Sequence, residues 1–124
     1  MWPWTVRRGV EAAPPGGDAP LETDAGAVAR RLAGADPPLI IDVRTPAEFA
    51  GGHIPQARHV PLADLAACIE LLPRECEIIC VCHSGRRSLA AARHLRAAGR
   101  RAASLAGGMM EWQGPTASGG GRPL

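Results

Sequence analysis

Two short, continuous apolar runs most constrain the fold of this chain: "LIIDV" at residues 39–43 and "EIICVC" at residues 77–82. Continuous rather than alternating apolar residues are typical of strands that are buried on both faces of a sheet. Helical patterns separate and follow these runs. Strands that alternate with helices predict an α/β fold, with a mostly parallel sheet covered by helices on both faces.

Start and stop signals locate the remaining elements. Thr23 or Asp24 can cap a first helix, and Thr45 followed by Pro46 predicts a second, short one. The longest helical pattern ends at Gly99. Helices are predicted within residues 21–36, 45–52, 62–72 and 86–99, further short strands within 57–62 and 102–108, and a short turn at "MMEW".

The length of 124 residues fits one domain with one core. Residues 1–20 and 115–124 lack hydrophobic periodicity and are rich in proline or glycine, so both are predicted to be flexible tails. Trp2 and Trp4 are the only anchors in the first tail, and a floating end is favoured over docking. The folded domain is predicted to span residues 21–114.

Charge and cysteine usage exclude several function classes. A net charge of +2 with dispersed arginines does not favour nucleic acid or an anionic membrane surface as a partner, and no apolar run is long enough to span a membrane. The four cysteines have no zinc-type spacing and follow no secretory leader. A soluble, cytoplasmic protein with reduced thiols and no bound metal is expected.

The second apolar run ends at a cysteine that enters an unusual loop. Ligands of parallel sheets bind beyond the carboxyl ends of the strands, where Cys82 is predicted to lie. The N-terminus of the following helix and nearby arginines can stabilise its thiolate. Gly85 permits a positive φ or a close approach to an anion, while Ser88 can cap the helix or donate to the sulfur. The candidate site comprises Cys82 as nucleophile with His83, Ser84, Gly85, Arg86, Arg87 and Ser88.

Three ordered motifs between residues 21 and 114 resemble the single-domain rhodaneses, a family of sulfurtransferases. The loop from Cys82 to Ser88 matches the family pattern C-x-x-G-x-R-S, "LIIDVRTPAEFAGGHIPQARHVPL" matches its upstream signature, and "LAGGMMEWQG" resembles its closing segment. The resemblance implies a central five-stranded sheet and a persulfide mechanism without a cofactor. Cys82 would take the outer sulfur of thiosulfate or a similar donor and pass it to cyanide, a thiol or an acceptor protein.

Loop length distinguishes this chain from phosphatases with a cysteine nucleophile, in which five residues separate the cysteine from an arginine. Here four residues separate Cys82 from Arg87, which favours sulfur chemistry. Arg86 and Arg87 together suit the doubly charged thiosulfate ion. Two alternatives use the same loop: a binding module without turnover, and a redox sensor with a low-pKa thiol.

Several other polar residues are predicted to have supporting or structural roles. Asp42 and Arg44 should form an ion pair or a turn-fixing pair at the end of another strand, on the same predicted edge as Cys82, and Glu48 is a similar candidate. His53 is interpreted as structural rather than as a general base. Cys80 should point to the same side of the strand as Cys82 and is assigned to the core.

Overall fold

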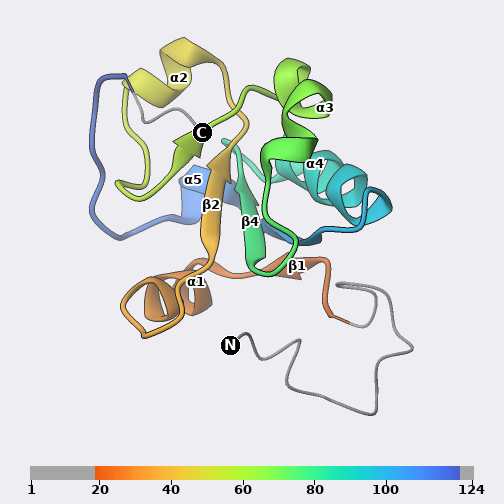
Figure 1. The fold of residues 1–124 in the computed structure, drawn as a ribbon. Coiled ribbons are helices and arrows are strands. Elements are labelled where there is room, and N and C mark those ends of the chain that lie inside the picture. Colours follow the sequence, from red (N-terminus) through yellow and green to blue (C-terminus); the bar gives the residue numbers. More distant parts are fainter. Residues whose placement is uncertain (1–18, 121–124) are drawn as a thin grey trace.

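A computed structural model describes residues 19–120 of the chain (Figure 1). Its strands form one sheet in the order β1-β5-β4-β2-β3, and every neighbouring pair is parallel. The α/β fold with a parallel five-stranded sheet is therefore confirmed. The strands are β1 Glu22–Thr23, β2 Leu39–Asp42, β3 Arg58–His59, β4 Glu77–Val81 and β5 Arg101–Leu105.

The two apolar runs form adjacent inner strands. β2 and β4 pair in register from Leu39 opposite Ile78 to Asp42 opposite Val81. All residues of β4 are buried, as its continuous apolar character predicts. Since both strands end at the same edge of the sheet, the residues that follow Asp42 and Val81 face a common region.

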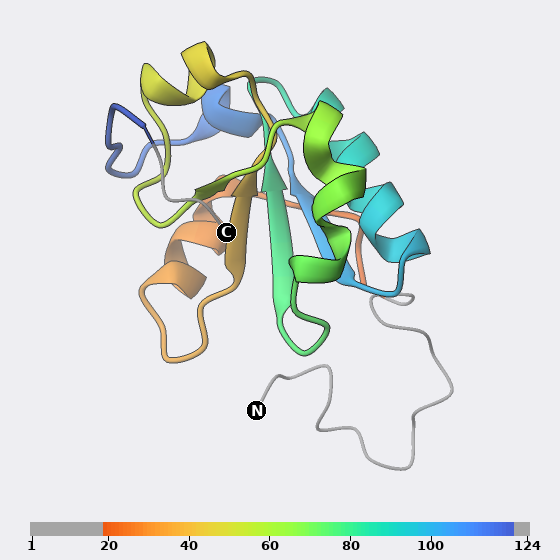
Figure 2. The same cartoon turned by 45° about the horizontal axis from the view of Figure 1, so that its top comes forward.

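Helices cover both faces of the sheet (Figure 2). The α3 and α4 helices pack on one face around Ile41, Ile78 and Cys80, whereas α1, α2 and α5 contribute to a second core around Ile40 and Ile79. This alternation of β4 residues between two cores follows from the two-residue period of a strand. The helices are α1 Ala25–Leu32, α2 Pro46–Ala50, α3 Leu65–Cys68, α4 Arg86–Ala97 and α5 Gly108–Glu111.

Side-chain caps begin the first two helices where the sequence predicts them. The Asp24 carboxylate accepts a 2.8 Å hydrogen bond from the Ala27 amide, so Asp24 rather than Thr23 caps α1. Thr45 and Glu48 form a capping box at α2, with proline at the first helical position. These caps fix where α1 and α2 begin relative to the sheet.

Three elements differ from the sequence-based prediction. Glu22–Thr23 forms the edge strand β1, although only two residues pair with β5 and no apolar run marks them. Residues 62–72 form not one helix but α3 between two 3-10 turns, Leu62–Asp64 and Ile69–Leu71. The segment "MMEW", predicted as a turn, forms most of α5. Elements this short are set by tertiary packing more than by local preference.

The chain ends show where the predicted tails meet the domain. Most of the predicted tail 1–20, including Trp2 and Trp4, lies outside the described residues; the Arg96 guanidinium donates to the carbonyls of Ala19 and Pro20. Beyond the predicted boundary at residue 114, Ala117 forms an antiparallel bridge with His53, and the Gly119 amide donates to the Ala50 carbonyl. Ordered contacts thus extend five residues past that boundary.

No helix within residues 19–120 is long and apolar enough to cross a membrane.

Candidate active site

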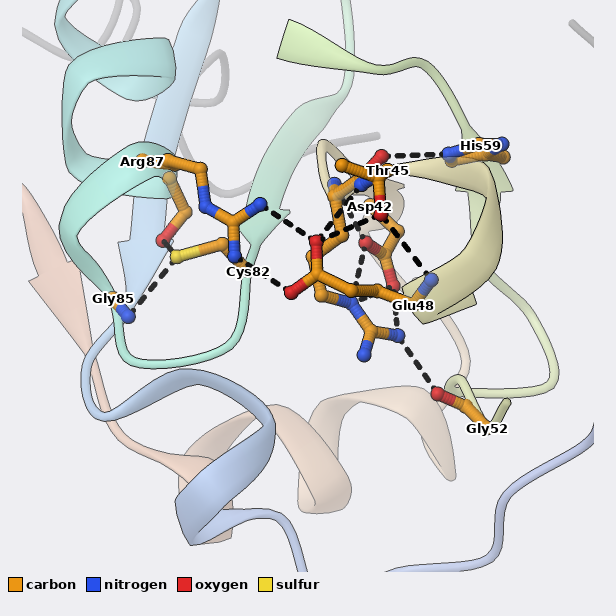
Figure 3. A network of polar contacts seen from close by, with 10 residues as sticks. Asp42, Thr45, Glu48, Gly52, His59, Cys82, Gly85 and Arg87 are labelled. Carbon is orange, nitrogen blue, oxygen red and sulfur yellow. Dashed lines mark hydrogen bonds and ion pairs between the residues drawn. The ribbon is translucent and has the colours of Figure 1, made fainter. Parts of the chain in front are cut away.

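Cys82 follows β4 directly, at the carboxyl edge of the sheet. Its residue exposure is only 1%, and the Gly85 amide donates a 3.0 Å hydrogen bond to its Sγ atom (Figure 3). A backbone N–H directed at sulfur stabilises the negative charge of a thiolate. The sulfur is therefore held by the loop that follows it rather than directed freely into solvent.

Gly85 has the conformation that the sequence predicts for it. Its φ of 101° lies in the left-handed region, and it precedes the first residue of α4. A Cβ atom built there would lie 3.0 Å from the Gly107 amide nitrogen, so glycine also permits close approach of a second loop. The tight turn places the N-terminus of a 12-residue helix beside the sulfur.

Ser88 contributes a hydroxyl to the sulfur rather than capping α4. Its Oγ lies 3.4 Å from Cys82 Sγ and 2.7 Å from the Oγ of Ser104 on β5, and both serines are fully buried. The thiol can donate to Ser88, and after ionisation the Ser88 hydroxyl can donate to the thiolate. Ser104 was missed by sequence reasoning; a serine inside the apolar strand "RAASL" was the available signal.

These contacts lower the pKa of the Cys82 thiol. Burial of the sulfur by itself raises the pKa, but hydrogen bonds from the Ser88 side chain and from the amides of Ser88, Gly85 and Ser84 outweigh it. The thiolate is the nucleophilic form of cysteine. The loop therefore favours the thiolate form of Cys82, chiefly through hydrogen bonds.

A glycine pair outside the predicted site supports this loop. The Met109 and Met110 amides donate to the carbonyls of Cys82 and His83 at 2.8 and 3.0 Å. A Cβ atom on Gly108 would lie 2.6 Å from His83 backbone atoms and closer still to the Cys82 carbonyl oxygen. Gly107 and Gly108, which the sequence offered only as part of a closing segment, thus allow α5 to dock against the loop.

Arg87 forms an ion pair with Glu48 that the sequence does not predict. Its guanidinium forms two hydrogen bonds, of 2.8 and 2.9 Å, with the two carboxylate oxygens of Glu48 on α2. The expected positive charge beside the sulfur is therefore largely balanced. Figure 3 shows the Arg87 side chain reaching from α4 toward Glu48. The remaining arginine of the loop, Arg86, is exposed.

The predicted pair of Asp42 and Arg44 forms and is buried. The Arg44 Nη2 atom lies 2.7 Å from an Asp42 oxygen and also donates to the Gly52 carbonyl at 2.8 Å. Arg44 therefore joins the end of β2 to the turn after α2, and α2 is the helix that contains Glu48. This supporting role matches the interpretation from the sequence.

The remaining candidates separate into structural and loop residues. His53 is buried, stacks on Phe49 and bonds to the Phe49 carbonyl through Nδ1, in agreement with a structural role. Cys80 lies in the same core as Cys82, and burial raises its pKa to about 12. His83 and Ser84 are exposed on the loop. No group of three potential metal ligands occurs within residues 19–120.

Comparison with known proteins identifies the family. Residues 24–115 match the model of the rhodanese-like domain, so the chain belongs to the rhodanese-like sulfurtransferase family. It is 35% identical to a sulfurtransferase of Allochromatium vinosum over 92 residues, which cover 73% of this chain and 86% of that one.

A second relative and a solved structure agree with this assignment. The Bacillus subtilis protein YtwF, provisionally named a sulfurtransferase, is 34% identical over 95 residues, covering 77% of this chain and 92% of YtwF. A rhodanese-like domain protein of Staphylococcus aureus superposes with a TM-score of 0.71 at 29% identity, covering 74% of this chain and 90% of that one.

Proposed function

We propose that this protein is an active sulfurtransferase of the rhodanese type, in which Cys82 carries sulfane sulfur as a persulfide. The donor is thiosulfate or a similar compound, and the acceptor is cyanide, a thiol or a protein thiol. The observation that carries the proposal is the hydrogen bond from the Gly85 amide to Cys82 Sγ within a loop that lowers the thiol pKa. Free thiols at all four cysteines agree with a reducing, cytoplasmic setting.

In the first half-reaction, the Cys82 thiolate attacks the outer sulfur of thiosulfate. A new S–S bond forms on Cys82, the donor S–S bond breaks, and sulfite leaves with that electron pair. The Gly85 amide and the Ser88 hydroxyl contact Sγ, so they stabilise Cys82 as the attacking thiolate and again as the thiolate that leaves in the second half-reaction. In the second half-reaction, an acceptor thiolate or cyanide attacks the outer sulfur and restores the Cys82 thiolate.

No cofactor or metal is needed for either step, because the sulfur atom moves between nucleophiles without net oxidation by a third component. Asp42 and Arg44 act by holding the surrounding elements. The exposed loop residues His83, Ser84 and Arg86 are the first that a donor meets.

Intact-protein mass spectrometry tests the proposal. The reduced protein is incubated with thiosulfate and, in parallel, with methanethiosulfonate, and then with or without cyanide; peptides around residue 82 are mapped. Gain of one sulfur on Cys82, removed by cyanide, is the expected result. A folded, reduced protein that gains no sulfur from either donor would contradict the proposal. Faster oxidation of Cys82 by peroxide than sulfur loading would favour the redox-sensor alternative.

A further inference from the structure

One polar contact beside the candidate site joins two residues of opposite charge on different helices. Arg87 and Glu48 meet in a two-pronged geometry, with side-chain exposures of 37% and 34%. A guanidinium that bonds in this way to a carboxylate is satisfied in both charge and direction. Arg87 would have to leave Glu48 before its full positive charge could act on a bound donor.

Glu48 is fixed independently of Arg87. The Thr45 amide and hydroxyl donate to its Oε1 atom at 3.0 and 3.1 Å. The hydrogen bond with Arg87 is the main cause that lowers the pKa of Glu48 to about 2; burial opposes this effect, and the contacts with Thr45 add to it. Glu48 is thus ionised at neutral pH, and its helix holds it toward Arg87.

The other charges near the loop leave little excess positive charge. Asp42 and Arg44 form a second balanced pair. Arg86 is exposed and has no ion-pair partner among residues 19–120. Its single positive charge can do no more than balance the negative charge of the Cys82 thiolate. A donor that reaches the thiolate therefore meets a site with almost no net positive charge.

Building on the proposed persulfide function, we propose that Glu48 determines donor specificity. By neutralising Arg87, it favours sulfane-sulfur donors with at most one negative charge over the thiosulfate dianion. The sequence suggested the opposite preference, because Arg86 and Arg87 were both counted as available to a dianion. The tertiary contact between α2 and α4 removes one of them from that role.

Two donors that differ by one charge isolate this effect. Thiosulfate carries two negative charges and releases sulfite; methanethiosulfonate carries one and releases methanesulfinate. In both reactions the Cys82 thiolate forms an S–S bond, the donor S–S bond breaks, and the leaving group takes the electron pair. Their intrinsic reactivities differ, so the informative quantity is how the ratio of their kcat/KM values changes between variants.

We define the ratio as kcat/KM for methanethiosulfonate divided by kcat/KM for thiosulfate, and we expect the variants to differ in it in a definite order. In Glu48→Gln, Arg87 loses its counter-charge and the ratio should fall about three- to tenfold at low ionic strength. In Arg87→Gln, Glu48 remains as an unbalanced negative charge and the ratio should rise. The double variant removes both charges and should return close to the wild-type ratio.

This order separates an electrostatic role from a merely structural one. If the pair served only to hold α2 against α4, both single variants would change the ratio in the same direction or not at all. Glu75→Gln is the matched control, because Glu75 is an exposed residue before β4, at the opposite edge of the sheet, and its loss changes the net charge equally. Its ratio should equal that of the wild type.

The experiment also distinguishes failure of this inference from failure of the proposed function. If the wild type takes up sulfur but the ratios of Glu48→Gln and Arg87→Gln stay within twofold of it, the specificity role of Glu48 is wrong and the persulfide function stands. If Glu48→Gln does not fold, the predicted rise of the ratio in Arg87→Gln still tests the proposal. If neither donor loads Cys82 in the wild type, both proposals fall.

Discussion

Ser88 Oγ lies 2.7 Å from Ser104 Oγ and 3.4 Å from Cys82 Sγ, so a buried pair of hydroxyls connects β5 to the Cys82 sulfur. Since Ser88 is among the causes that lower the pKa of Cys82, Ser88→Ala should raise this pKa. The pH dependence of Cys82 alkylation measures this pKa. In Ser88→Ala the alkylation rate should begin to rise at a higher pH than in the wild type.

Ser104→Ala is the matched variant for this prediction. It removes the hydroxyl that contacts Ser88 but leaves the Ser88 contact with sulfur, so its titration should move less than that of Ser88→Ala. Ser88→Ala removes the hydroxyl that the buried Ser104 contacts, which costs about 1–3 kcal/mol of unfolding free energy. Equal titration curves for both variants and the wild type would contradict the role of Ser88.

Cys82→Ser should abolish sulfur loading while the protein stays folded. A serine hydroxyl is close in size to the thiol and can still accept from the Gly85 amide, but at neutral pH it is not ionised and does not attack sulfur. Mass spectrometry measures loading and thermal unfolding measures the fold. Sulfur uptake by folded Cys82→Ser would exclude Cys82 as the carrier.

Gly108→Ala should disrupt the loop. The added Cβ would lie 2.6 Å from His83 backbone atoms, and the φ of 57° at this position is unfavourable for alanine. We expect a lower unfolding temperature and much slower sulfur loading, because α5 can no longer donate to the Cys82 carbonyl. Gly120→Ala, where an added Cβ meets nothing within 4 Å, should behave as the wild type.

The Glu48–Arg87 pair should make stability depend on pH. Glu48 has a folded-state pKa of about 2, against about 4.3 in an unfolded chain, so the pair stabilises the fold fully above that unfolded value. The stabilisation is lost as the pH falls from about 4.3 toward 2. Denaturant unfolding of wild type and Glu48→Gln should therefore differ at pH 7, and the difference should shrink below about pH 4.3 and vanish only near pH 2.

Arg87→Gln provides the matching test of this pH dependence, because it breaks the same pair from the other side. Its stability deficit should fade over the same pH interval. The side chains are about one-third exposed, and added salt should therefore reduce the difference. A Glu48→Gln deficit that is constant from pH 7 to pH 3 would show that the lost stability is not electrostatic.

Arg100 is a buried structural arginine that should matter for stability. Only 2% of it is exposed, and its guanidinium donates to the carbonyls of Ile69, Leu72 and Ala98. Arg100→Ala leaves these carbonyls without that donor and should cost about 3 kcal/mol or more. Arg93→Ala, at an exposed position of α4, should change stability by less than about 0.5 kcal/mol. Equal stabilities would contradict this role.

The position of Cys82 and the turn of its loop could be predicted from the sequence because the required information is local. The apolar run before Cys82 specifies a buried strand, and Gly85 specifies a turn that no bulkier residue adopts easily. The Thr45–Glu48 capping box likewise depends on only four consecutive residues. Such features depend on neighbouring residues along the chain, so they can be predicted before the fold is known.

The sequence by itself determined the α/β fold, the position of Cys82 and the turn at Gly85. Only the tertiary structure decided which charges remain available there: Glu48 and Arg87 are 39 residues apart in sequence, yet they neutralise each other across α2 and α4. Ser104 and Gly108 reach the loop in the same way, from β5 and α5. Charge balance and close packing depend on distances in space, which spacing along the chain does not encode.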